Sequence, residues 1–267
     1  MKALQETESP TNEDIMASAM GLLGEKEIED DERVTYGDLR MRISPKEGKA
    51  ITLLADQLFS PSLLLAERIE RGLIPLHGVT MLELGAGVAL PSLLASTLPS
   101  PPALVVITDY PDEAIMSNLR YNVESNGDLI QPGCEVIVRG YEWGTDATTL
   151  LNILPPAKSG TGYDVLFLSD LLYFDAHDSL IRSMVLLLSR RPASRAYIGA
   201  GKYTPSAVCS RFLSAAADAG FVVEQGEFDG DWKGSMNVSD LTAEELCLRK
   251  GNVYWWVARW NNTVLQT

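Results

Sequence analysis

The chain has 267 residues and a net charge of −14 at pH 7, and 46% of its residues are hydrophobic. That length and apolar content suffice for one large domain with a sizeable core. An acidic surface repels phosphate backbones, so the charge argues against a nucleic-acid partner and favours a basic or neutral one. No apolar run is long enough to span a membrane, and the acidic N-terminus does not look like a secretory signal peptide.

The three cysteines, Cys134, Cys209 and Cys247, are far apart and odd in number. This pattern favours reduced thiols and a cytoplasmic location over a disulfide framework. The two histidines, His77 and His177, are also widely separated, so no metal-binding spacing is present and no metal is expected. The composition carries no information about the oligomeric state.

The first part of the chain, residues 1 to about 33, is polar and acidic and ends in four consecutive acids at 29–32. We expect a mobile or loosely docked arm over residues 1–33 and a single domain over residues 34–267. The acidic run is most simply a solvated face, with a docking site for a basic partner as the alternative. Alternating apolar residues in 34–51 predict a small hairpin.

Strands and helices then alternate along the rest of the chain. Ser60 as N-cap, Pro61 at the first helical position and Gly72 as a stop predict the first helix. Apolar runs predict strands over 79–84, 104–108, 135–141, 164–169, 196–200, 221–223 and 253–260. Amphipathic periodicity and breakers predict further helices over 90–98, 111–126, 180–188, 205–219 and 240–248, with a loop and one helical turn over 144–162.

This alternation implies right-handed crossovers and a mostly parallel sheet. The last two strands lack a crossover helix of the usual kind, which makes a terminal antiparallel hairpin natural. The expected fold is therefore α/β, a doubly wound seven-stranded sheet with a C-terminal antiparallel hairpin.

A glycine turn follows the first strand of this sheet. Gly85 and Gly87 permit a tight strand-to-helix turn and let a ligand approach bare backbone, and the helix N-terminus behind them offers free N–H groups. A dinucleotide fingerprint would need a small residue where Leu90 stands. Glu83, just before the turn, favours instead a ligand with a cationic amino group. A purely structural turn with no ligand is the alternative.

Polar and aromatic residues also follow the next three strands. They are Asp109, Trp143, and the pair Ser169 and Asp170. Ligands of open parallel sheets bind at the carboxyl ends of the strands, near the switch in strand order. There Asp109 can accept both ribose hydroxyls of an adenosine, Trp143 can cover an adenine, and Asp170 would lie beside the reacting group. An aspartate in such a place can also be a helix cap, and a tryptophan can belong to the core.

These residues form a recognisable set. The segment from Glu83 to Gly87 resembles motif I of the class I methyltransferases that bind S-adenosylmethionine. The whole set looks like the seven-strand lysine methyltransferases of family 16, over roughly residues 50–200. The most similar branch is the fungal one described as nicotinamide N-methyltransferase-like or as elongation-factor lysine and N-terminal methyltransferases. The other matching segments are 90–92, 108–111, 118–119 with Asn122, 143–144, and the Asp-x-x-Tyr signature at 170–173.

The resemblance implies an S-adenosylmethionine-dependent methyltransferase that acts on an amine of a protein, either a lysine or the N-terminal amine. A small-molecule N- or O-methyltransferase and a non-catalytic module that binds S-adenosylmethionine are the alternatives. The family usually has a tryptophan where this chain has Phe59. The expected cofactor-binding residues are Phe59, Glu83, Gly85, Ala86, Gly87, Asp109, Tyr110, Trp143 and Ser169.

Methyl transfer to an amine requires that the amine first loses its proton. The expected catalytic residues are Asp170, which can accept a hydrogen bond from the amine, Tyr173, which can orient it, and His177, a possible base. The alternative for His177 is an exposed loop position, and for Asp170 a turn cap. Residues 199–203 and 232–249 do not match the family and would shape the acceptor pocket.

Overall fold

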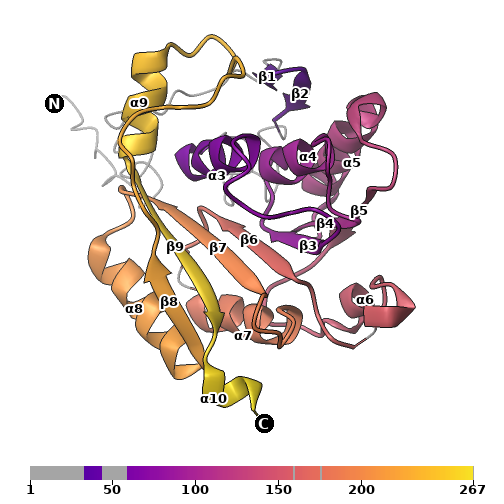
Figure 1. Cartoon of the computed structure of the whole chain (residues 1–267), viewed down its shortest axis with the longest axis vertical. Helices are drawn as coiled ribbons and strands as arrows, with labels where there is room; N and C mark the ends of the chain where they lie inside the picture. Colours follow the sequence, from indigo (N-terminus) through magenta and orange to yellow (C-terminus); the bar gives the residue numbers. More distant parts are fainter. Residues whose placement is uncertain (1–32, 44–58, 159, 175, 267) are drawn as a thin grey trace, which may run out of the picture.

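The computed structural model describes residues 33–43, 59–158, 160–174 and 176–266. Within these ranges the chain forms a seven-stranded sheet in the order β5-β4-β3-β6-β7-β9-β8 and a separate two-stranded sheet, β1-β2 (Figure 1). The strands are β1 (Arg33–Tyr36), β2 (Leu39–Arg42), β3 (Thr80–Leu84), β4 (Leu104–Asp109), β5 (Glu135–Gly140), β6 (Val165–Ser169), β7 (Arg195–Gly201), β8 (Phe221–Gln225) and β9 (Val253–Trp260).

Helices connect most of these strands. They are α3 (Ser60–Glu70), α4 (Leu90–Ser96), α5 (Glu113–Ser125), α6 (Thr148–Leu151), α7 (His177–Leu187), α8 (Ser206–Asp218), α9 (Ala243–Gly251) and α10 (Asn262–Leu265), with short 3-10 turns at Gly127–Leu129 and Pro156–Lys158. The predicted strands and crossover helices are all present, and α6 is the expected helical turn in 144–162. The short α10 was not predicted.

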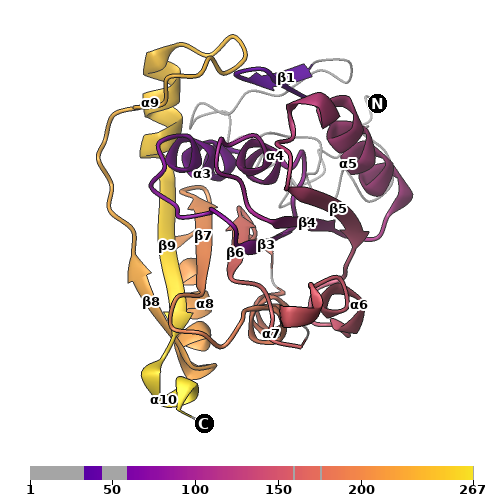
Figure 2. The same cartoon turned by 45° about the vertical axis from the view of Figure 1, so that its right-hand side comes forward.

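The sheet is parallel from β5 to β7, and β9 runs antiparallel to both of its neighbours. The predicted doubly wound fold with a terminal antiparallel hairpin is therefore confirmed. Every residue of β3, β4 and β6 is buried, as expected for central parallel strands that are covered on both faces. Helices α3, α4 and α5 lie on one face of the sheet and α7 and α8 on the other (Figures 1 and 2).

The first residues of α3 and α5 differ from the prediction. Phe59, not Ser60, is the extended N-cap of α3, because the hydroxyl of Ser60 accepts a hydrogen bond from Arg249 Nε at 3.1 Å instead of capping the helix. Helix α5 begins after Asp112, whose carboxylate accepts from the backbone N–H groups of Ala114 and Ile115. The predicted helix began at residue 111, so this N-cap was not expected.

The predicted hairpin in 34–51 is present as β1 and β2, and residues 44–51 lie outside the described part of the chain. Its inward side chains, such as Tyr36 and Met41, join the core formed by α3, α4 and α5. The predicted arm, except Arg33 at its end, also lies outside the described residues. Among the residues that the structure describes, no helix is long and apolar enough to cross a membrane.

Candidate active site

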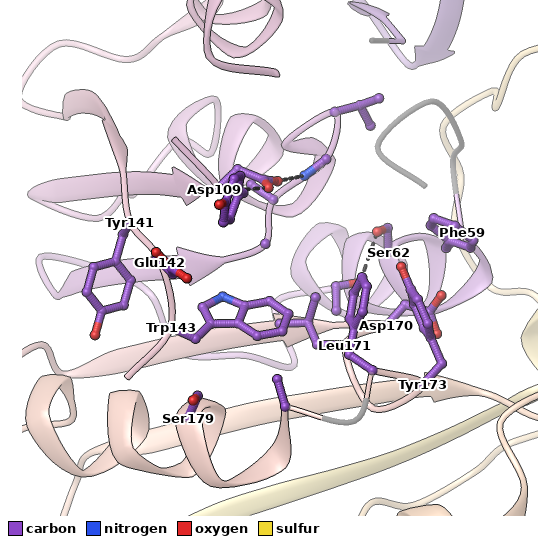
Figure 3. Close-up of a pocket in the computed structure, with 18 residues that line it drawn as sticks. Phe59, Ser62, Asp109, Tyr141, Glu142, Trp143, Asp170, Leu171, Tyr173 and Ser179 are labelled. Atoms are coloured by element: carbon purple, nitrogen blue, oxygen red, sulfur yellow. Dashed lines mark hydrogen bonds between the residues drawn. The ribbon is translucent and has the colours of Figure 1, made fainter. Parts of the chain in front are cut away.

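The strand order of the large sheet reverses between β3 and β6, which lie side by side. The loops after these two strands diverge, and a cavity of about 240 Å³ opens at their carboxyl ends (Figure 3). Residues after β3, β4, β5 and β6 line it, together with the first turns of α3 and α7. The lining residues are Phe59, Ser62, Gly85, Ala86, Gly87, Val88, Asp109, Tyr110, Tyr141, Glu142, Trp143, Ser169, Asp170, Leu171, Tyr173, Phe174, Ala176 and Ser179.

The glycine turn forms one wall of this crevice. Gly85 and Gly87 have φ angles of 58° and 55°, a conformation that favours glycine. A Cβ on Gly85 would come within 2.6 Å of Leu171 Cδ2, whereas a Cβ on Gly87 would meet nothing within 4 Å. The space in front of Gly87 is therefore open, so a ligand can approach bare backbone there.

Asp109, at the end of β4, holds the glycine turn through a hydrogen bond to its backbone. Its Oδ2 accepts from the backbone N–H of Gly87 at 2.8 Å, and its Oδ1 accepts from that of Tyr110 at 2.7 Å. Burial raises the pKa of this carboxyl to about 6, although both N–H donors favour the ionised form. Each oxygen keeps a lone pair for a further donor, and the residue lines the crevice. The arrangement suits two hydroxyl groups of a ligand.

Glu83 lies beneath the turn and does not line the crevice. It is fully buried, and its Oε2 accepts from the backbone N–H of Ser92 in the first turn of α4 at 3.3 Å. That helix has Ala89 as its N-cap, which offers no side-chain hydrogen bond, so Glu83 supplies the missing acceptor. Burial, with the nearby Asp109 charge, raises the pKa of Glu83 to about 8. The direct contact with a ligand amine that we expected from Glu83 has no counterpart in this arrangement.

Trp143 forms the floor of the crevice after β5 (Figure 3). Its indole packs edge-on against the ring of Phe174, with ring centroids 5.5 Å apart. Ser183 of α7 holds this segment, because its hydroxyl accepts from the backbone N–H of Gly144 at 2.8 Å. The flat, half-buried ring is thus fixed in a place where it can cover a heterocycle.

The end of β6 supplies the polar groups at the opposite side of the crevice. Asp170 is buried and has a φ of 61°, which is uncommon outside glycine. Its Oδ1 accepts from the backbone N–H of Gly201 at 2.9 Å, and its Oδ2 accepts from the hydroxyl of Tyr203. The hydroxyl of Ser169 lies 2.9 Å from that of Ser62 in α3. A buried carboxylate is therefore held firmly beside the cavity.

A cluster of aromatic rings adjoins this carboxylate through Tyr203, whose hydroxyl donates to it. The ring of Tyr173 lies 4.1 Å from that of Phe174 and 6.4 Å from that of Phe59, and Phe59 is 6.5 Å from Tyr203. A carboxylate beside aromatic rings is an environment that attracts the protonated, cationic form of an amine. Ser62 and Phe174 were not predicted from the sequence, whereas Tyr203 lies in the segment 199–203 that was expected to shape the acceptor pocket. Gly201 of this segment packs against the Tyr203 ring, since a Cβ on Gly201 would fall within 2.2 Å of that ring.

His177 does not reach the crevice. It is the first residue of α7, where its Nε2 lies 2.9 Å from the carbonyl oxygen of Leu172 and its ring packs edge-on against Phe212. The helix that the sequence predicted from Leu180 begins at His177, so His177 is not a loop residue, and because it does not line the cavity it is not placed to act as the expected base. Of the other predicted site residues, all except Glu83 line the cavity. No group of three or more histidine, cysteine or acidic residues in the described ranges could hold a metal ion.

Comparison with known proteins gives one protein family and a common fold. A family model described as lysine methyltransferase matches residues 56–203. The chain is 32% identical over 197 residues to the protein N-terminal and lysine N-methyltransferase EFM7 of Gibberella zeae, which covers 67% of this chain and 74% of that protein. It is 31% identical over 169 residues to the protein of the same name from Emericella nidulans, covering 59% of this chain and 64% of that protein.

Two solved structures share the fold. A putative S-adenosylmethionine-dependent methyltransferase from Streptococcus mutans aligns with a TM-score of 0.50 at 10% identity, covering 87% of this chain and 56% of that one. A putative methyltransferase complexed with SAH (S-adenosylhomocysteine) aligns with the same TM-score and identity, covering 87% and 57%. At this level of identity the similarity concerns the fold, which agrees with the α/β sheet described above.

We expect Asp109→Ala to lower the affinity for S-adenosylhomocysteine by at least about a hundredfold, because it removes the acceptor for two hydroxyls and releases Gly87. Titration calorimetry measures this change. Asp112→Ala is the matched control: it removes the cap of α5, costs about 1 kcal/mol of stability, and leaves the affinity within about twofold. An unchanged affinity in Asp109→Ala would show that Asp109 does not bind the ligand.

The affinity should also depend on pH. Asp109 accepts hydroxyl hydrogen bonds when it is ionised, so binding is complete above its pKa of about 6 and weakens as the pH falls through that value. At pH 5 we expect binding about tenfold weaker than at pH 7.5. Asp109→Asn should bind weakly at both values, without this dependence. A flat wild-type affinity between pH 7.5 and 5 would contradict the assignment.

Proposed function

This chain belongs to the lysine methyltransferase family, and from that premise we propose that it methylates a protein amine, either a lysine side chain or an N-terminal amine. It is an S-adenosylmethionine-dependent methyltransferase. The observation that carries the proposal is the single crevice that joins the glycine turn and Asp109 to the buried Asp170 and its aromatic neighbours. The names of the relatives from Gibberella zeae and Emericella nidulans, both protein N-terminal and lysine N-methyltransferases, agree with such an acceptor.

The residues present suit the cofactor. The open space in front of Gly87 and the spare lone pairs of Asp109 fit a nucleoside whose ribose hydroxyls donate to the carboxylate. Trp143 would cover the adenine, and Tyr110 would border the ribose beside Asp109. When bound, S-adenosylmethionine supplies a methyl group activated by its sulfonium charge. Ser169 and Phe59 would border the part of the cofactor that points toward Asp170.

Asp170 and Tyr173 are the groups we assign to the acceptor. An amine attacks a methyl group through its nitrogen lone pair, so it must arrive neutral or lose a proton to water. Asp170 accepts a hydrogen bond from the amine and so orients the nitrogen, and the ring of Tyr173 packs against the carbon chain that carries it. Tyr203 is a positioning residue in this scheme, because its hydroxyl donates to Asp170 and fixes the carboxylate.

The remaining features are also proposals. We place the enzyme in the cytoplasm because its three cysteines are odd in number and widely spaced. We treat residues 34–267 as one domain, since the β1–β2 hairpin shares the core of α3, α4 and α5. The net charge of −14 favours a basic protein acceptor over a nucleic acid.

The acceptor class is tested with radiolabelled S-adenosylmethionine in a cell lysate. Purified enzyme should transfer label into the protein fraction, and hydrolysis of that fraction should yield methylated lysine or a methylated N-terminal residue. Asp109→Ala serves as the control that lacks the cofactor site. Label confined to small molecules would point to a metabolite methyltransferase. Cofactor binding without any transfer would point to a non-catalytic module, and either result overturns the proposal.

Substitutions at the acceptor side should slow turnover and leave cofactor binding intact. We expect Asp170→Asn to lower kcat by about a hundredfold and Tyr173→Phe by about tenfold, with the S-adenosylhomocysteine affinity unchanged within about twofold. Asp178→Asn, an exposed position on α7, is the matched control and should behave like the wild type. Wild-type rates in both variants would refute the assignment.

A further inference from the structure

Two asparagines of α5 and the asparagine that caps its C-terminus form a ladder along β2. Asn118, Asn122 and Asn126 are spaced by four residues, so they share one face of the helix, and all three are buried. Asn122 Oδ1 accepts from the backbone N–H of Arg42 at 2.8 Å, and its Nδ2 donates to the Arg42 carbonyl at 2.9 Å. Asn126 makes the same pair of bonds with Arg40, both at 2.9 Å.

This ladder takes the place of a neighbouring strand. The edge of β2 that faces away from β1 presents backbone N–H and carbonyl groups, which need partners when buried. A side-chain amide has the same donor and acceptor as a peptide group, so it can pair with both. Asn118 contributes a third member, because its Nδ2 donates to the Arg42 carbonyl at 2.9 Å and its Oδ1 accepts from Arg42 Nε. The ladder thus attaches the hairpin to α5.

Asn122 makes one contact that the other two asparagines lack. Its Nδ2 also donates to the carbonyl oxygen of Val88 at 3.3 Å. Val88 directly follows Gly87 and lines the crevice. One buried amide therefore binds the main chain of the hairpin and the main chain of the glycine turn at the same time.

The turn needs such support. Gly85, Gly87 and Ala89 all have positive φ angles, and at Ala89, with φ of 64°, this conformation carries a steric cost. Asp109 holds the turn at the Gly87 N–H, while Asn122 holds it one residue later, at the Val88 carbonyl. The two bonds fix the peptide units on either side of the Gly87–Val88 link.

The hairpin is a firm anchor because its other side is tied to distant parts of the chain. The hydroxyl of Tyr36 donates to Glu70 Oε2 in α3 at 2.6 Å. The backbone N–H of Gly37 donates to the carbonyl of Asn237 at 2.8 Å, in the segment that enters α9. Figure 2 shows β1 over the helices of this face, beside that segment.

We propose that Asn122 is a positioning residue for cofactor binding, and that it uses the docked β1–β2 hairpin to hold the Val88 carbonyl in place. The hairpin lies outside the family-matched residues 56–203 and, on this proposal, contributes to cofactor binding by holding Asn122. The inference rests on the proposed function in one respect, that the crevice in front of Gly87 binds S-adenosylmethionine.

The test compares Asn122→Ala with Asn126→Ala and Asn118→Ala, which lose hydrogen bonds to β2 without touching Val88. Each variant should unfold at a lower temperature than the wild type. We expect Asn122→Ala to bind S-adenosylhomocysteine about tenfold more weakly by calorimetry, and both controls to stay within about twofold of the wild type. In turnover assays Asn122→Ala should raise KM for S-adenosylmethionine and leave kcat at saturating cofactor unchanged.

Asn122→Asp gives a second measurement if the alanine variant does not fold. It keeps the acceptor for the Arg42 N–H and loses the donor to the carbonyls of Val88 and Arg42, so its affinity should also fall. Equal affinities in the Asn122 and Asn126 variants would overturn the inference, because a general loss of packing would then explain the effect. If the wild type itself does not bind S-adenosylhomocysteine, the proposed function is wrong. That result is distinct from a failure of the Asn122 inference, in which the wild type binds and the variants do not differ.

Discussion

The reversal of strand order at β3 and β6 is the constraint on which the site depends. From β3 the chain moves outward to β4 and β5 through α4 and α5, and from β6 it moves the other way through α7 and α8. Right-handed crossovers therefore place these helix pairs on opposite faces of the sheet. The loops after β3 and β6 must therefore diverge, and this divergence alone is enough to form the crevice between them.

Buried side-chain groups hold the main chain of the glycine turn that borders this crevice, where Gly85, Gly87 and Ala89 have positive φ angles. Asp109 and Asn122 bind the backbone on either side of Gly87, and Glu83 binds the first turn of the helix behind it. Burial raises the pKa of Glu83 to about 8 and that of Asp109 to about 6. Near neutral pH the Glu83 carboxyl is therefore mostly neutral and the Asp109 carboxyl mostly ionised. The negative charge is thus kept where ligand hydroxyls can reach it.

The fold and most of the site could be predicted from the sequence, because both follow from local patterns. Apolar runs mark parallel strands, and their carboxyl ends meet at one edge, which brought Gly85, Asp109, Trp143 and Asp170 together. Side-chain direction was harder to predict. Glu83 points beneath the turn toward α4, and His177 points away from the crevice because α7 begins earlier than its apolar periodicity indicated. The hydrogen bond from Tyr203 to Asp170 and the asparagine ladder depend on tertiary contacts that no local pattern records.

A crystal structure of the protein with S-adenosylhomocysteine would test the central claim most directly. The account predicts the nucleoside in the crevice in front of Gly87, with its ribose hydroxyls within hydrogen-bond distance of both Asp109 oxygens. It also predicts the adenine beside Trp143 and the sulfur on the side of Asp170. A nucleoside bound elsewhere, or bound in the crevice without contact to Asp109, would contradict the account.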